Sequence, residues 1–161
     1  FFQNLKDVVI FTFSTSSSSA SIPFTLKAAE EKYGVDKSIS TFTVPLGATI
    51  NMDGTAIMQG CATFFLASLY GIDLGINEII TIVITATIAS IGTAGIPSAG
   101  IIMLTVIFTQ IGIPLEGITL LLGVDRLLDM MRTSVNVSGD LCISCIIASS
   151  ENKINGKLYH S

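Results

Sequence analysis

Between Glu78 and Glu116 the sequence contains no aspartate, glutamate, lysine or arginine. A helix of a water-soluble protein needs a polar face, and this stretch cannot provide one. At roughly 20 residues per spanning helix, it is long enough for about two passes through the hydrocarbon of a membrane. Over the whole chain 12% of the residues are charged, which is about half the fraction in a typical soluble domain. The sequence therefore predicts an all-α membrane protein.

The charge balance and the cysteines argue against two other classes of function. The net charge is −4 at pH 7 and no basic patch is interleaved with aromatic residues, so no nucleic-acid partner is expected. Cys142 and Cys145 form a C-x-x-C pattern, which in other settings indicates redox or metal chemistry. No second pair accompanies it, so we interpret these residues as two thiols one turn apart on an apolar helix.

Two segments share one pattern, in which a short apolar arm, a break rich in small residues and a second short arm follow one another. The first covers residues 1–33 with a serine run at 14–21, and the second covers residues 78–111 with a break at 92–100. Each arm is too short to span a membrane, which takes about 20 residues. The serine run alone would suit a flexible linker, but apolar arms flank it closely. Because non-helical backbone at membrane depth must be buried in protein or line a cavity, we predict two re-entrant helical hairpins.

Two longer apolar segments are predicted to be transmembrane helices. One covers residues 39–70 and is broken at Asn51-Met-Asp-Gly-Thr55, and the other covers residues 115–150. Together with the hairpins they form one domain, residues 1–150, followed by a polar tail at 151–161. Apolar sequence runs from the first residue onward, so we expect the chain to begin inside a folded unit of a longer protein.

The lysines predict the orientation in the membrane. The links at 70–78 and 109–117 contain no basic residue, whereas the first hairpin's base and the tail are basic through Lys27, Lys32, Lys37, Lys153 and Lys157. The positive-inside rule then places those basic segments and the C-terminus in the cytoplasm. The first hairpin would enter from the cytoplasm and the second from outside.

The last apolar segment carries a polar stripe that lipid would not tolerate. At about 100° per residue, five side chains fall within roughly 80° of one another. They are Asp125, Asp129, Arg132, Asn136 and Asp140. Each ionised group at membrane depth costs about 2.5–3.5 kcal/mol on insertion scales. Asp129 and Arg132 could pair at i,i+3 in a purely structural ladder, but charge inside a membrane favours a functional site.

The other groups that could bind a ligand or an ion lie at or near the helix breaks. Gly54 lets the helix unwind beside Asp53, so that free carbonyls and a carboxylate could hold a monovalent cation such as sodium. Helix N-termini at the 92–100 break favour a ligand carboxylate. Arg132 can hold a second carboxylate in a bidentate pair, and Asp129 can receive an ammonium group. These groups predict an anionic amino acid as ligand. No catalytic arrangement is found, so an enzyme is not expected.

Three motifs, in this order, resemble the glutamate transporter family, the dicarboxylate/amino acid:cation symporters that include the animal excitatory amino acid transporters. They are Asn51-Met-Asp-Gly-Thr55, Gly92-Thr-Ala-Gly-Ile-Pro97 and Asp125-x3-Asp-x2-Arg-Thr-x2-Asn-x3-Asp140. The serine run before Ile22-Pro23 is similar to the family's first hairpin. The resemblance implies a fragment of an elevator-type transport domain in the plasma membrane, in contact with lipid. It also implies a homotrimer formed through a scaffold domain that is absent from this chain.

By resemblance, Arg132 binds the side-chain carboxylate of the substrate, L-aspartate or L-glutamate, and Asp129 binds its amino group. The other implied substrate contacts are Ser18, Thr55, Ala94, Ile96, Thr133 and Asn136. Co-transported Na⁺ is implied at three sites. Their residues are Asp140 with Gly47, Asn51 and Asn136; Thr49, Ser90, Ile91 and Thr93 with Met52; and Asp53 with Asn51.

Differences within the family favour sodium-coupled symport of an acidic amino acid. Neutral amino acid members lack an arginine at the position of Arg132, and members that carry dicarboxylates without an amine tend to lack the acid at Asp129. Proton-coupled members lack the acid at Asp140, and a proton-coupled dicarboxylate symporter of the same family is the alternative. An intramembrane aspartyl protease would need two carboxylates that share a proton, and a channel would need weak multi-site conduction. The predicted site fits neither.

Two further positions bear on coupling and binding. Potassium-coupled animal members carry a glutamate where this chain has Gln59, so potassium countertransport is not expected. Some members carry an arginine at the first hairpin tip, where this chain has Ser16. We hypothesise that Arg126 supplies an equivalent cation and contacts the substrate.

Overall fold

The computed structural model describes residues 1–156, and helices dominate this part of the chain. The elements are, in order, α1 (Phe2–Thr15), α2 (Ser18–Glu31), α3 (Lys37–Ile50), α4 (Asp53–Leu69), α5 (Ile76–Ile91), α6 (Ala99–Ile111), the 3₁₀ turn η1 (Leu115–Gly117) and α7 (Ile118–Ser150). Within residues 1–156, β pairing is limited to one isolated antiparallel bridge between Val35 and Ile154. The all-α prediction is therefore confirmed. Lys157 and the end of the predicted tail lie outside the described residues.

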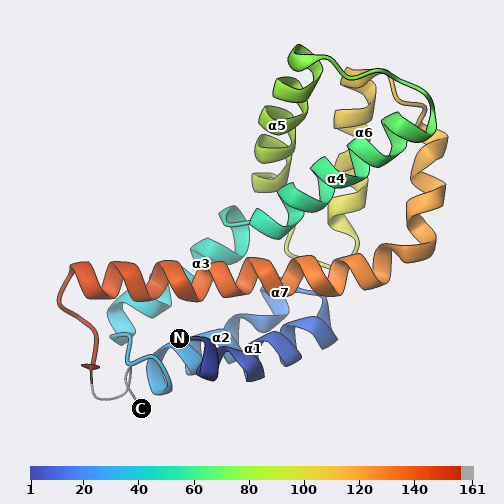
Figure 1. Ribbon diagram of the computed structural model, residues 1–161. Helices are drawn as coiled ribbons and strands as arrows, with labels where there is room; N and C mark the ends of the chain where they lie inside the picture. The colour runs from blue at the N-terminus through green and yellow to red at the C-terminus, as the bar shows by residue number, and fades with distance from the viewer. Residues whose placement is uncertain (157–161) are drawn as a thin grey trace.

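Two helical hairpins lie in the segments that carry the arm–break–arm pattern (Figure 1). α1 and α2 form hairpin 1, and α5 and α6 form hairpin 2. Their arms contain 14, 14, 16 and 13 residues, fewer than the roughly 20 that a spanning helix needs. Among residues 1–156, no helix is both long enough and apolar enough to cross a membrane by itself.

The segment at 39–70 is broken where the sequence predicts. α3 ends at Ile50 and α4 begins at Asp53, while Asn51 (φ −95°, ψ 81°) and Met52 (φ −114°, ψ 46°) leave the helical conformation. Helix ends carry carbonyls and amides without partners in their own helix. The break therefore presents the free carbonyls of α3 and the free N–H groups of α4 at one place.

Local sequence explains where several helices begin and end. Ser17 caps α2 by accepting a hydrogen bond from the Ala20 N–H at 3.1 Å, and Asp36 caps α3 by accepting one from the Ser38 N–H at 2.8 Å. Hydrogen bonds from Ser38, first from its hydroxyl and then from its N–H, hold the pKa of Asp36 below its ordinary value. Residues with a left-handed backbone end α2, α4, α6 and α7, and these are Gly34, Gly71, Gly112 and Asn152.

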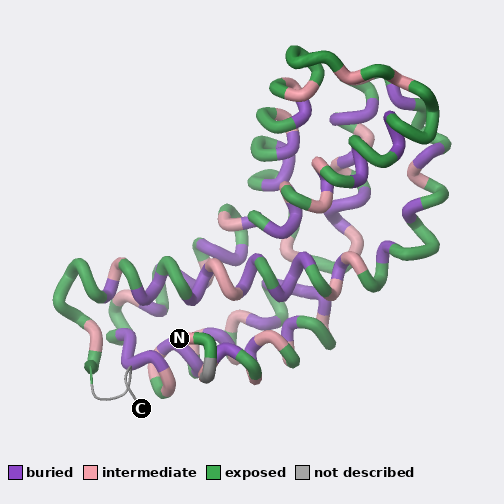
Figure 2. Tube along the Cα trace, viewed as in Figure 1, coloured by how far each residue is buried: buried purple, intermediate pink, exposed green. Residues whose placement is uncertain are grey.

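Two hydrophobic cores, both of which include α7, enclose the polar stripe. The first core contains residues of α1, α2, α3 and the C-terminal half of α7, among them Val8, Ala29, Val44 and Leu141. The second contains residues of α4, α5, α6 and the start of α7, among them Leu66, Ile82, Leu104 and Leu121. In Figure 2 the outer side of α5 is exposed and the side that faces the other helices is buried. Because α7 joins the two cores, its residues from 125 to 136 lie between them.

The two cysteines of the C-x-x-C pattern lie on α7, as interpreted from the sequence. Cys145 is buried in the first core, and Cys142 is exposed.

Candidate substrate and ion site

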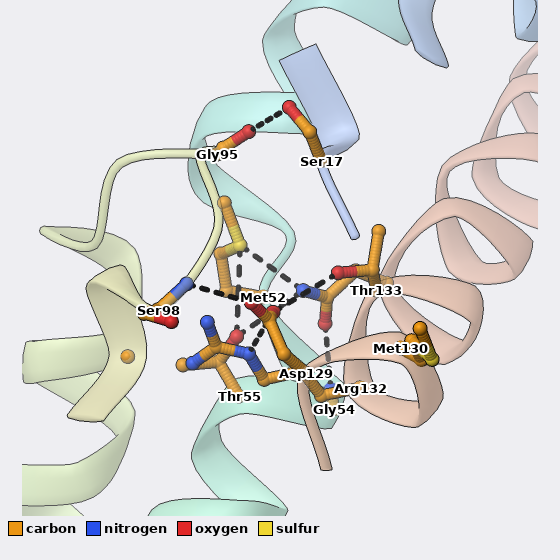
Figure 3. Close-up of polar contacts among 12 residues, drawn as sticks. Ser17, Met52, Gly54, Thr55, Gly95, Ser98, Asp129, Met130, Arg132 and Thr133 are labelled. Carbon is orange, nitrogen blue, oxygen red and sulfur yellow. Dashed lines mark hydrogen bonds and ion pairs between the residues drawn. The ribbon is translucent and has the colours of Figure 1, made fainter. Parts of the chain in front are cut away.

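The tips of the two hairpins touch each other between the two cores. The carbonyl oxygen of Gly95, in the tip of hairpin 2, accepts hydrogen bonds from the Ser17 hydroxyl at 2.7 Å and from the Ser19 N–H at 3.1 Å (Figure 3). Ser16 turns the chain with a left-handed backbone (φ 50°), and its N–H donates to the Thr12 carbonyl at 2.9 Å. The serine run is thus an ordered tip that closes one side of the site.

A buried ion pair lies beneath these tips. Arg132 Nε donates to Asp129 Oδ1 at 2.7 Å, and the two residues are 5% and 1% exposed. The second carboxylate oxygen of Asp129 accepts a hydrogen bond from the Ser98 N–H at 2.6 Å (Figure 3). Ser98 itself has a left-handed backbone (φ 61°) at the start of α6. Asp129 therefore joins hairpin 2 to the guanidinium group through its two oxygens.

The side chain of Asn136 connects α7 to the break between α3 and α4. The Asn136 side chain accepts a hydrogen bond from the Gly54 N–H at 2.8 Å and donates to Thr55 Oγ1 at 3.2 Å and to Met52 Sδ at 3.2 Å. Glycine is required at position 54, because a Cβ there would overlap the Arg132 carbonyl and lie 3.0 Å from the Arg132 Cα. The unwound segment is thereby fixed against the polar stripe.

These groups surround one small polar cavity. Every substrate contact implied by the family resemblance lines it, namely Ser18, Thr55, Ala94, Ile96, Asp129, Arg132, Thr133 and Asn136. Ser16, Met52, Thr93 and Gly95 complete the lining. The cavity measures about 10 Å³, which is room for about one water molecule. The cavity is therefore too small for an amino acid unless the groups that line it move apart.

Three buried side-chain atoms within residues 1–156 have no hydrogen-bond partner, and all belong to this region. They are Ser16 Oγ, Gln59 Oε1 and Arg132 Nη1. Buried polar atoms are nearly always paired in folded proteins. The unpaired Nη1 matters most, because a guanidinium that is bound through Nε still offers a free N–H to an incoming acceptor.

The first predicted sodium set lies together at the far end of the stripe. The Asn51 amide donates to Asp140 Oδ1 at 2.8 Å and to the Asn136 carbonyl at 3.2 Å. Asp140 is 2% exposed. Gly47 lies against its carboxylate, where a Cβ would be 2.8 Å from Asp140 Cγ. All four residues of this set are in contact.

The structure brings together only some of the residues of the other two predicted sodium sites. Met52 and Thr93 line the substrate cavity, while Thr49, Ser90 and Ile91 lie at the C-terminal ends of α3 and α5, two helices that contact each other. Carbonyls at helix C-termini are free and carry partial negative charge, which suits a cation. Asp53 of the third set is exposed and lies beside Asn51 near Gly139.

Comparison with known proteins agrees with the family resemblance that the sequence motifs indicate. A profile of the sodium:dicarboxylate symporter family matches residues 1–150. The chain belongs to this family. It is 54% identical over 125 residues, 78% of the chain, to excitatory amino acid transporter 3 of Mus musculus, and covers 24% of that protein. It is 50% identical over 140 residues to excitatory amino acid transporter 1 of Rattus norvegicus and 49% identical over 140 residues to excitatory amino acid transporter 3 of Homo sapiens. In both cases 87% of the chain is aligned, against 26% and 27% of the relatives.

The chain thus spans about a quarter of the length of the curated relatives that it matches. Each relative is named as a transporter of excitatory amino acids. The family resemblance drawn from the motifs is confirmed.

Arg126, which the sequence suggested as a further ligand contact, does not reach this cavity. It is exposed and is not among the residues that line the cavity, because it follows Asp125 by one residue and so points about 100° away from it around α7.

Several residues of the site were not predicted from the sequence. Ser98 and Gly95 hold hairpin 2 through backbone atoms, which any residue type could supply, so only the tip motif hinted at them. Gly100 and Gln59 lie far apart in the sequence and are joined by a hydrogen bond, in which Gln59 Nε2 donates to the Gly100 carbonyl at 3.1 Å. No spacing in the sequence signals such a long-range contact.

Replacing Gly100 with alanine is expected to weaken binding of an acidic ligand strongly. A Cβ at position 100 would overlap Arg132 Nη1 and lie 2.6 Å from its Cζ, so the guanidinium would have to leave its place. We expect a loss of about tenfold or more in affinity for L-aspartate, equivalent to about 1.4 kcal/mol, measured by calorimetric titration of the full-length protein. Gly60→Ala, where a Cβ meets nothing within 4 Å, is the matched control. Equal affinities in the two variants would contradict the assignment.

Proposed function

We propose that this chain is the substrate- and ion-binding part of a secondary active transporter that moves L-aspartate or L-glutamate together with sodium. The observation that carries the proposal is the buried Asp129–Arg132 pair where the two hairpin tips meet. One member of the pair can bind a carboxylate and the other an ammonium group. A ligand that carries both groups can replace the ion pair between Asp129 and Arg132 with two ion pairs of its own, one to each residue.

The surrounding groups complement the rest of such a ligand. The unpaired Arg132 Nη1 can donate to the ligand's side-chain carboxylate, in the bidentate geometry that guanidinium groups prefer. Asp129, freed from Arg132, can accept from the ammonium group. Thr55, Thr133 and Asn136 line the same cavity, as does Ser18 at the N-terminus of α2, where helix amides favour an anion such as the α-carboxylate.

Sodium would bind beside Asp140 and at the ends of α3 and α5. The Asn51 amide now donates to Asp140, so an entering ion would take the place of this N–H group and turn the amide oxygen toward itself. Asn51 donates to the Asn136 carbonyl, and the side chain of Asn136 lines the substrate cavity and accepts from the Gly54 N–H. Sodium binding at Asn51 would therefore order the helix break on which the substrate contacts depend. This link provides a physical reason for coupling the two.

The elevator movement, the homotrimer and the missing scaffold belong to the same proposal and are supported by family membership alone. So is a location in the plasma membrane in contact with lipid. A symporter binds and releases its substrate unchanged, so no enzymatic step is proposed.

We propose the orientation in which the C-terminus is cytoplasmic. Lys32 at the base of hairpin 1 and Lys153 after α7 lie at one end of the molecule, because the chain after α7 pairs with the α2–α3 link. The links before α5 and after α6 meet at the other end, where a Cβ on Gly117 would lie 3.0 Å from the Tyr70 ring. A cysteine introduced at Asn77 is expected to react with an impermeant reagent from outside the cell. Labelling from the cytoplasm alone would reverse the orientation.

The test of the function is calorimetric titration of L-aspartate into the purified full-length protein, with and without sodium. Binding that requires sodium supports the proposed symport. Binding that is independent of sodium but strengthens at low pH would favour the alternative, a proton-coupled dicarboxylate symporter of the same family. No binding of aspartate, glutamate or a plain dicarboxylate would overturn the proposal.

A further inference from the structure

A groove lies between α1 and α2 near the base of hairpin 1. The two helices pack side by side (Figure 1), and the base is held by a hydrogen bond from the Asn4 amide to the Lys32 carbonyl at 3.3 Å. The groove measures about 320 Å³, which is within the range of small-molecule sites, roughly 300–1,000 Å³. It is lined by Asp7, Phe24, Lys27, Ala28, Glu31 and Lys32. We call it the base groove.

The base groove carries two positive and two negative side chains. Asp7 and Lys32 form an ion pair between the two helices, and Lys27 Nζ lies 4.0 Å from Glu31 Oε2, one turn away on α2. The side chains of the second pair are 70% and 65% exposed, and an exposed pair at this distance is held only weakly. The groove is therefore electrically balanced and can offer partners to a ligand that carries one group of each sign.

The groove becomes apolar with distance from the base. Phe24 precedes Glu31 by two turns of α2, which is about 10 Å along the helix axis. Its ring stacks on Phe11 of α1, with the ring centroids 4.5 Å apart, and Ile10 beside them is exposed. The polar headgroup layer of a bilayer is roughly 5–8 Å thick on each side of the hydrocarbon. The change from charged groups to aromatic rings therefore matches the change from lipid headgroups to acyl chains.

We propose that the base groove binds the headgroup of a phosphatidylethanolamine molecule from the cytoplasmic leaflet. The lipid phosphate lies between Lys27 and Lys32, and the ammonium group lies at the Glu31 carboxylate. The acyl chains run over Phe24 and Phe11 into the hydrocarbon. This site rests on the proposed location and orientation in a membrane, and not on which ligand is transported.

The balance of charges selects this headgroup among phospholipids. A primary ammonium group has three N–H donors that a carboxylate can accept, whereas the quaternary ammonium of phosphatidylcholine has none. Phosphatidylglycerol would satisfy the lysines, but it brings no cation to Asp7 and Glu31 and adds a negative charge beside them. Only a headgroup with a phosphate and an N–H-bearing cation pairs with both kinds of side chain.

Photolabelling of the full-length protein in detergent tests the site. The probe is a phosphatidylethanolamine with a photoreactive group on one acyl chain, and the labelled residues are mapped by mass spectrometry. We expect labelling of α1 and α2 around Phe11 and Phe24. Unlabelled phosphatidylethanolamine should prevent this labelling at about tenfold lower concentration than phosphatidylcholine, because a hydrogen bond to a charged group contributes about that much affinity.

Two variants separate the phosphate contact from the ammonium contact. Lys27→Gln removes a partner of the phosphate, which all phospholipids carry, and should weaken competition by phosphatidylethanolamine and phosphatidylcholine alike. Glu31→Gln removes the acceptor of the ammonium group and should abolish the preference between them. Both residues are exposed, so neither change is expected to disturb folding. Glu116→Gln is the matched control, since Glu116 is exposed on η1 at the other end of the molecule, and it should keep the full preference.

Several results would overturn the proposal. They are the absence of labelling on α1 and α2, equal competition by phosphatidylethanolamine and phosphatidylcholine, and a preference that survives in Glu31→Gln or is lost equally in Glu116→Gln. Strongest competition by phosphatidylglycerol would show a general basic surface instead of this site. Failure of the parent protein to bind L-aspartate would count against the proposed function alone, because the photolabelling does not depend on the transported ligand.

Discussion

Arg132→Ala is expected to abolish measurable binding of L-aspartate, with a loss of at least about a hundredfold in affinity. Removing one partner of a buried, hydrogen-bonded charge pair costs about 2–5 kcal/mol. The guanidinium group is 5% exposed and lies in the cavity wall, so no water would replace it easily as a partner for the ligand's carboxylate. Calorimetric titration of the full-length variant in sodium measures the effect.

The same substitution is expected to lower thermal stability, because it leaves Asp129 buried without its cation. Losing one member of a buried ion pair typically costs about 3–5 kcal/mol, so the melting temperature must be measured beside the affinity. Arg126→Ala is the control, since it also removes one arginine of α7 but at an exposed position. The structure predicts nearly unchanged affinity there. Weaker aspartate binding in Arg126→Ala would restore the sequence hypothesis for that residue and contradict the geometry.

Asp140→Asn is expected to raise the sodium concentration needed for aspartate binding by about a hundredfold, or about 2.7 kcal/mol. The change removes the negative charge that would face the ion but keeps an oxygen that can accept from the Asn51 amide. Attraction between opposite charges in a buried site is stronger than in water, so the loss should fall on sodium more than on the folded structure. Titrations of aspartate at a series of sodium concentrations measure it.

The control for this variant is Asp73→Asn in the exposed α4–α5 link. It makes the same chemical change outside the site, and its sodium dependence should match that of the parent protein. If Asp140→Asn lowers aspartate affinity equally at every sodium concentration, Asp140 supports the substrate cavity rather than an ion, and the proposed sodium site at Asn51 and Asp140 is wrong.

The sequence by itself determined the kind of fold and most members of the site. A long stretch without charge demanded an apolar environment, and short arms around small-residue breaks predicted the hairpins, because helix length and charge are local properties. The 100° helical repeat placed Asp129, Arg132 and Asn136 on one face of α7. All three are buried on that face. The separate motifs supplied the family, which the match over residues 1–150 confirms.

Only the tertiary structure decided how these parts meet. The Gly95–Ser17 contact spans 78 positions of the chain, and the bond from Gly54 to Asn136 spans 82; no local pattern encodes such pairs. The same holds for Gly100 beside the Arg132 guanidinium and for Gly34 beside Asn155, where glycine is needed because another part of the chain approaches closely. Helix periodicity fixes which way a side chain points, but its partner depends on packing between segments far apart in sequence. For that reason the exposure of Arg126 and the closure of the cavity emerged only from the folded molecule.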